Sequence, residues 1–130
     1  MLVFHHTAVL VSDIDDAILH YLPLFGKESI SEKVFIATQG VNVCFIKVGE
    51  KSFIELVEPV DENSVVFKLK KKGNSYYHVG YISNSIEADV EMMVTLNYKQ
   101  LEYFNSEGFQ HKRCIFLFSP DGHLIELIEA

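Results

Sequence analysis

The stretch Phe53-Ile54-Glu55-Leu56-Val57-Glu58 is the main indication of the fold of this chain. It is repeated near the C-terminus as Leu124-Ile125-Glu126-Leu127-Ile128-Glu129. Four of the six positions are identical. Both stretches place a carboxylate among branched apolar residues, in a pattern that is typical of a buried strand. A single short match of this kind arises easily by chance, so the interpretation depends on whether other parts of the chain repeat as well.

A second internal match has almost the same spacing. The residues His6-Thr7-Ala8-Val9-Leu10 align without gaps with His78-Val79-Gly80-Tyr81-Ile82, and the match continues from Ile14-Asp15 to Ile86-Glu87. Two matched pairs at nearly equal offsets indicate an internal duplication. We therefore expect two copies of one structural module.

The apolar pattern predicts the same order of elements in both copies, namely a strand, a helix and three strands. In the first copy we expect strands at 4–11, 34–37, 41–48 and 52–58, and a helix that follows an N-cap at Ser12, ends at Gly26 and frays in its last turn at Pro23. In the second copy we expect strands at 76–82, 101–104, 114–118 and 123–128, and a helix at 86–96. A short helix within 61–73 would connect the copies.

This order predicts an α+β fold made of two pseudo-symmetric βαβββ modules. We expect a single domain over residues 1–130, with the first module at about 3–59, a linker at about 60–75 and the second module at about 76–130. Hydrophobic residues make up 48% of the 130 residues, which is enough to bury a core.

Each module opens with a histidine on its first strand and closes with a glutamate in its last strand. The glutamates stand out because a buried, unpaired carboxylate costs several kcal/mol and needs a partner. Pseudo-symmetry would bring the two histidines and the two glutamates together, where they could share one divalent cation. We call these residues the metal quartet: His6, Glu55, His78 and Glu126.

The ligand types leave the identity of the ion open. Imidazole suits zinc, nickel, cobalt and iron, whereas carboxylates also admit manganese and magnesium. A six-coordinate ion would keep two positions for water or substrate, as catalytic sites do. Such an ion can polarise a carbonyl oxygen and stabilise the enediolate that forms when the neighbouring C–H loses its proton. The expected base is one of the ligand carboxylates, Glu126 or Glu55.

Composition argues against several other classes of protein. The 11 Lys+Arg and 18 Asp+Glu residues give a net charge of −7, which disfavours binding to nucleic acid or to an anionic membrane surface. The chain has no run of about eighteen apolar residues and no secretion signal at its N-terminus, so we expect a cytoplasmic protein with no membrane partner. Cys44 and Cys114 are expected to be buried thiols.

Four stretches resemble the vicinal oxygen chelate superfamily: H-T-A-V-L-V-S-D-I-D from His6, F-I-E-L-V-E-P from Phe53, Y-H-V-G-Y from Tyr77 and S-P-D-G-H-L-I-E-L-I-E from Ser119. This superfamily includes glyoxalase I, methylmalonyl-CoA epimerase, extradiol dioxygenases and bleomycin-resistance proteins. The similarity runs from about residue 4 to the C-terminus. It implies a cupped mixed sheet around a metal held at the quartet positions, and it implies a homodimer.

The order His, Glu, His, Glu resembles both glyoxalase I of the bacterial type and the epimerases, which implies a thioester or hemithioacetal as substrate. The C-terminal stretch is more similar to glyoxalase I, and the linker is more similar to the epimerases. Epimerases carry a glutamate, one of two acid/base groups, where this chain has Thr38. Threonine cannot act as a carboxylate base, so we expect a proton shuttle through one glutamate of the quartet. Thr38, Lys112 and Arg113 are weaker candidates for contacts to the substrate.

Two alternative functions stay open. An Fe(II) dioxygenase of the extradiol type would use His6, His78 and Glu126, although a fourth ligand at Glu55 disfavours it. A non-enzymatic protein that binds a drug or metabolite would not need all four ligand residues. Two further expectations concern neighbouring residues: His5 should point to the strand face opposite His6, and the run 70–72 of three lysines should form a solvated helix face.

Overall fold

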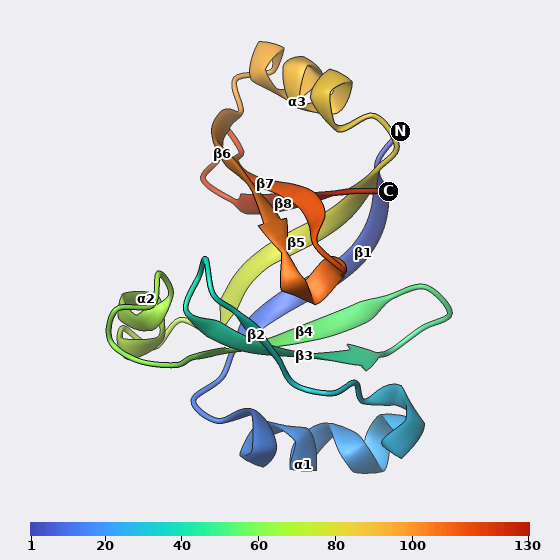
Figure 1. Ribbon diagram of the computed structural model, residues 1–130, viewed down its shortest axis with the longest axis vertical. Coiled ribbons are helices and arrows are strands. Elements are labelled where there is room, and N and C mark those ends of the chain that lie inside the picture. Colours follow the sequence, from blue (N-terminus) through green and yellow to red (C-terminus); the bar gives the residue numbers. More distant parts are fainter.

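The computed structural model describes residues 1–130 and contains one mixed sheet of eight strands that curls around its own interior (Figure 1). The first half comprises β1 (Val3–Leu10), α1 (Ile14–Phe25), the 3-10 turn η1 (Lys27–Ser29), β2 (Val34–Ile36), β3 (Val41–Lys47) and β4 (Phe53–Pro59). The second half follows α2 (Phe67–Lys71) and comprises β5 (Tyr76–Ser83), α3 (Ile86–Thr95), β6 (Lys99–Ser106), η2 (Glu107–Phe109), β7 (Lys112–Phe118) and β8 (Leu124–Glu129). The predicted α+β fold with two βαβββ modules is confirmed.

The two halves pair in the same way. The strand order is β2-β3-β4-β1-β5-β8-β7-β6. In each half the first strand runs parallel to the last one, β1 with β4 and β5 with β8, and the halves join where β1 pairs antiparallel with β5. The four strands that carry the quartet are therefore the four central strands of the sheet.

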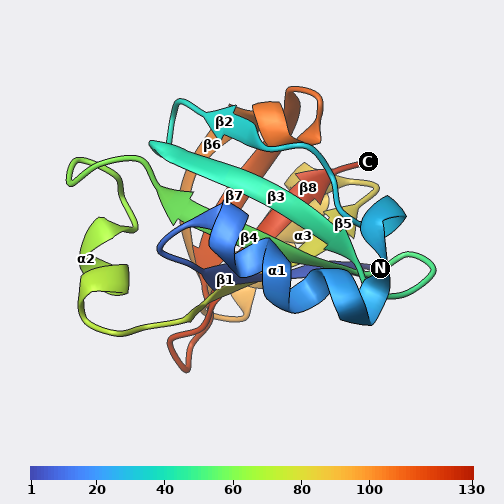
Figure 2. The same ribbon diagram turned by 90° about the horizontal axis from the view of Figure 1, so that it is seen from below.

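The two long helices lie on the outside of the curled sheet. Helix α1 crosses β3 and β4, as Figure 2 shows from below, and it buries Ile14 against Cys44 and Leu56. On the other half, α3 packs its apolar face on β7 and β8. Both cysteines are buried and free. No helix of this chain has the length and apolar character needed to cross a bilayer.

The inner face of the sheet forms a separate apolar core that both halves supply. Strand residues such as Leu10, Val43 and Val57 come from the first half, and Tyr77 and Phe116 come from the second. Side chains alternate along a strand, so Ala8 and Val57, two positions from His6 and Glu55, share the face of the quartet. Tyr77 reaches the same core from the position next to His78, where the pairing of β1 with β5 is irregular.

Two local expectations about α1 were wrong. The N-cap of α1 is Asp13, whose carboxylate accepts a hydrogen bond from the backbone N–H of Asp16 at 3.0 Å, so Ser12 lies outside the helix. Pro23 does not fray α1, which continues to Phe25 and ends at Gly26. The predicted short helix within 61–73 is confirmed as α2, and the residues before it are held by the β2–β3 hairpin, where Ser64 donates to the carbonyl oxygen of Gln39 at 3.0 Å.

Candidate metal centre

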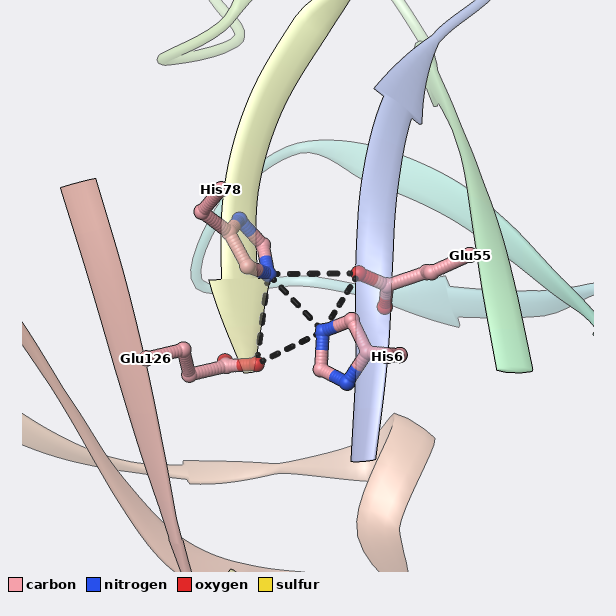
Figure 3. Close-up of side chains that lie close together, drawn as sticks. All are labelled: His6, Glu55, His78 and Glu126. Atoms are coloured by element: carbon pink, nitrogen blue, oxygen red, sulfur yellow. Dashed lines mark hydrogen bonds and ion pairs between the residues drawn. The ribbon is translucent and has the colours of Figure 1, made fainter. Parts of the chain in front are cut away.

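The quartet comes together because its residues sit at matched registers on adjacent strands. Ala8 is the Cα partner of both Glu55 on β4 and His78 on β5, and Gly80 is the partner of both His6 on β1 and Glu126 on β8. All four side chains point into the interior from their strands and converge on one point (Figure 3). The structure thus brings together all four residues that the sequence predicts as metal ligands.

Gly80 makes room for this arrangement. A Cβ atom at this position would lie 2.5 Å from Nδ1 and 2.7 Å from Nε2 of His6. Atoms do not approach so closely, and the ring of His6 has no exposed surface toward which it could move. Glycine at position 80 is therefore a requirement of the site.

The ligand atoms are closely and evenly spaced. The Nε2 atoms of His6 and His78 are 3.0 Å apart. Oε1 of Glu55 lies 3.4 Å and 3.5 Å from these two nitrogens, and Oε1 of Glu126 lies 3.4 Å from each. None of the four residues is more than 3% exposed.

This geometry fits a metal ion. Two ligand atoms at about 2.1 Å from one ion lie about 3.0 Å apart in octahedral directions and about 3.4 Å apart in tetrahedral directions. The buried atoms Nδ1 of His78 and Oε1 of Glu126 also have no hydrogen-bond partner within the protein. A cation would satisfy Oε1 of Glu126, and it would separate two imidazole nitrogens that otherwise face each other. The quartet can therefore hold a divalent cation.

Electrostatics within the quartet favour ionised glutamates and raise the pKa values of both histidines in the protein without metal. Burial lowers the pKa of His6, but the carboxylates of Glu126 and Glu55, each 3.4 Å from its Nε2 atom, outweigh burial and raise this pKa to about 9. Burial raises the pKa of Glu55, but hydrogen bonds to His6 and His78 outweigh it and lower this pKa to about 2. The pKa values of His78 and Glu126 move in the same directions as those of His6 and Glu55 for the same reasons. A metal ion bound by the quartet would therefore compete with protons for the same nitrogens.

His5 does not point away from His6, contrary to the expectation from strand alternation. The pairing of β1 with β5 is irregular between Phe4 and His6, and the two imidazoles meet with their Nδ1 atoms 2.9 Å apart. The ring of His5 stacks on Phe53, with 4.9 Å between centroids. Burial, followed by the charge of His6, lowers the pKa of His5 to about 4. Neutral His5 can accept the Nδ1–H of His6, which directs Nε2 of His6 toward the other three residues of the quartet.

A His5→Phe variant should bind metal about 10 to 100 times more weakly, because it keeps the stacked ring but removes the acceptor that orients His6. A competition titration with a chromophoric chelator measures this affinity directly. His20→Phe is the matched control, since His20 is exposed on α1. Equal affinities for the two variants would show that His5 does not orient His6.

The weaker candidates for substrate contacts lie in different places. Thr38 lines a pocket of about 560 Å³ beside the quartet. Lys112 is exposed at the start of β7. The structure does not favour Arg113 as a substrate contact: its guanidinium donates to Glu129 at 3.0 Å and also to Glu87, so carboxylates of the protein already occupy it.

Aromatic side chains around the histidines were not predicted from the sequence. Phe109 of η2 stacks on His6 at 5.7 Å between centroids, and Tyr77 and Phe116 contact His78 at 4.5 Å and 5.1 Å. Phe109 and Phe116 come from elements distant in sequence from these histidines. Their spacing in the sequence gave no signal, because the contacts exist only after the sheet curls.

Paired βαβββ modules around a buried cluster of two histidines and two glutamates define a class of fold whose central site could hold a metal ion. A sequence profile of the Glyoxalase/Bleomycin resistance protein/Dioxygenase superfamily matches residues 5–116, and the chain belongs to this superfamily. Its relatives include the uncharacterized protein YqjC of Bacillus subtilis (strain 168), which is 28% identical over 128 residues, or 95% of this chain and 89% of the relative.

Solved structures of methylmalonyl-CoA epimerases share the fold. The enzyme from Mycobacterium tuberculosis is 25% identical, with a TM-score of 0.83 over 97% of this chain and 86% of that one. A variant of the Streptomyces coelicolor enzyme in complex with 2-nitronate-propionyl-CoA is 25% identical, with a TM-score of 0.86 over 100% of this chain and 99% of that one.

Proposed function

We propose that this protein is a divalent-metal-dependent enzyme that moves a proton on the carbon next to the carbonyl group of an acyl thioester. The observation that carries the proposal is the quartet itself, a buried His2Glu2 cluster whose ligand atoms are spaced for one cation. Its structural neighbours include epimerases of an acyl-CoA substrate. A hemithioacetal substrate, as in glyoxalase I, is the second candidate, and the C-terminal stretch from Ser119 favours it.

His6, His78, Glu55 and Glu126 would hold the ion. When bound, the ion supplies a Lewis acid that draws electron density from a carbonyl oxygen and so makes the neighbouring C–H more acidic. Glu55 and Glu126 together balance its charge. His5 keeps His6 in the tautomer that can ligate.

Glu126 is the better candidate for the base. Phe116 is its Cα partner on β7 and Leu124 lies two positions away on β8, and both line the pocket beside the quartet. Glu55 lies on the other side of the quartet, opposite Phe45 on β3. The carboxylate of Glu126 is therefore the one that a substrate in the pocket would meet.

Thr38 lines the same pocket but has no carboxylate. The acid/base glutamate that the resemblance to epimerases places at position 38 is therefore missing, and Glu126 would both remove and return the proton. Because a single base acts on one face of the carbon, we expect exchange of the proton with solvent to run faster than inversion of the carbon.

An acyl thioester with an anionic carrier fits the mouth of the pocket. Leu69 of α2 lines the pocket, and its neighbours Lys68 and Lys70 place two cations next to it. Lys68 and Lys71 are exposed. These lysines could therefore meet the phosphates of a carrier, in addition to forming the solvated helix face that the sequence predicts.

Deuterium exchange tests the proposal. The metal-loaded protein is incubated in D2O with methylmalonyl-CoA or with the methylglyoxal–glutathione adduct, and incorporation is followed by mass spectrometry. We expect exchange that disappears on chelation and returns with added metal. Tight binding of either compound without exchange would instead favour a binding protein, and exchange of the adduct alone would favour the glyoxalase I reaction.

Metal affinity should rise with pH. His6, with a pKa of about 9 in the protein without metal, is protonated at neutral pH and must lose that proton to ligate. Affinity should therefore grow about tenfold per pH unit for each proton displaced and level off above about pH 9. Calorimetric titration in buffers of different ionisation enthalpy counts the released protons. An affinity that does not change between about pH 6 and pH 8 would contradict this competition.

A further inference from the structure

We infer that the substrate of this centre presents an uncharged apolar group, about the size of a phenyl ring, to the pocket beside Glu126 and His78. This inference rests on the proposed function and deepens it by naming the chemistry of the group attached to the reacting carbon. The place of the pocket, its lining and its charge each support it.

The pocket lies on the side of the quartet where the base is expected. Its inner wall includes Tyr77 and Phe116, whose rings contact the imidazole of His78. Phe116 and Leu124 flank Glu126 on the inner face of the sheet. A group attached to a carbon that reacts at Glu126 would therefore extend into this pocket.

The lining is apolar and rich in aromatic rings. Nine of the twelve lining residues are hydrophobic, among them Phe104, which stacks on Phe116 with 5.5 Å between ring centroids. Leu101 and Phe118 continue the wall on β6 and β7. A wall of this kind favours a flat or branched hydrocarbon group, which gains free energy by leaving water.

The charges in the pocket disfavour an anion. No lysine or arginine lines it, and its one carboxylate is Glu102. Arg113, whose guanidinium lies 5.1 Å from the ring centroid of Tyr103 in this wall, is paired with Glu129 and Glu87. A carboxylate on the substrate would lose its hydration here without gaining a counter-ion from the lining.

The volume also exceeds what a methyl group needs. The pocket measures about 560 Å³. That lies within the range of about 300–1,000 Å³ for small-molecule sites. A phenyl ring or a branched chain would fill the aromatic end, whereas a methyl group would leave most of this apolar wall in contact with water.

A matched pair of thioesters tests the inference. Methylmalonyl-CoA and 2-phenylpropionyl-CoA differ only in the carboxylate or phenyl group on the reacting carbon. With the metal-loaded protein, we expect 2-phenylpropionyl-CoA to bind about tenfold more tightly or better, as burial of a ring in place of a charge implies. Calorimetry measures binding, and deuterium incorporation in D2O measures exchange separately.

Leu101→Lys places a cation in the wall and should reduce the preference for the phenyl thioester about fivefold or more. Leu19→Lys is the matched control, because Leu19 is 64% exposed on α1 and does not line the pocket. Both positions are exposed, so both variants are expected to fold. Equal effects of the two substitutions on the binding ratio would overturn the assignment of this pocket.

The results that would overturn the proposed function differ from those that would overturn the inference of an apolar substrate group. Tighter binding of methylmalonyl-CoA than of the phenyl thioester, together with metal-dependent exchange, would overturn the inference and leave the proposed function standing. Tight binding of the phenyl thioester that Leu101→Lys weakens, without exchange of either compound, would support the pocket assignment and overturn the proposed reaction.

Discussion

Gly80→Ala is expected to abolish tight metal binding. The added methyl group would lie 2.5 Å from Nδ1 and 2.7 Å from Nε2 of His6, so the imidazole must leave its place among the ligands. Alanine usually suits a strand better than glycine, by about 0.5–1 kcal/mol. Here the overlap outweighs that gain, and we expect the free energy of unfolding to fall by about 1–3 kcal/mol. Metal analysis after dialysis and thermal unfolding measure the two effects.

Gly49→Ala is the control for this substitution. A Cβ atom at Gly49 would lie 3.4 Å from Cβ of Ser52, far from the quartet, and Gly49 has no positive φ. This variant should keep its metal and most of its stability. A Gly80→Ala protein that binds metal as tightly as the Gly49→Ala protein would show that His6 can ligate from another position, and glycine at position 80 would then not be required.

The duplication made the fold and the quartet predictable from the sequence. Two matched pairs of strands fix the order of elements, and they also place the ligand residues at equivalent positions in each half. The sequence could not show that β1 and β5 pair at the centre of one sheet. That pairing is what brings Glu55 and Glu126 to opposite sides of the same pair of imidazoles.

The surroundings of the quartet were less predictable, and His5 shows why. Strand alternation assigns neighbouring residues to opposite faces, but an irregularity in the pairing of β1 with β5 turns His5 toward His6. Phe109 and Phe116 reach the histidines only because the sheet curls. Arg113 looked free in the sequence because its carboxylate partners, Glu87 on α3 and Glu129 on β8, come from other elements.

Changing each of the two glutamates to glutamine should distinguish the role of Glu55 from the role of Glu126. Both Glu55→Gln and Glu126→Gln remove a ligand charge, so both should weaken metal binding, and the double variant should bind no metal after dialysis. Neutral glutamines also remove the charge from the buried carboxylates, so we expect the metal-free double variant to fold. It should lose the stabilisation of about 2.7 kcal/mol that a metal at a hundredfold excess over its Kd gives the unchanged protein.

The rate of deuterium exchange per bound metal ion then identifies which glutamate is the base. Glu126 adjoins the pocket through Phe116 and Leu124, so Glu126→Gln should lose about 10²–10⁴-fold in exchange even when excess metal fills the site. Glu55 lies on the side of the quartet away from the pocket. Glu55→Gln should therefore recover much of its exchange in excess metal, because this variant is defective only in metal affinity. Measuring exchange in D2O across a metal titration separates the two effects. If metal rescues Glu126→Gln and not Glu55→Gln, the base is Glu55, and the substrate must approach from the side of Phe45.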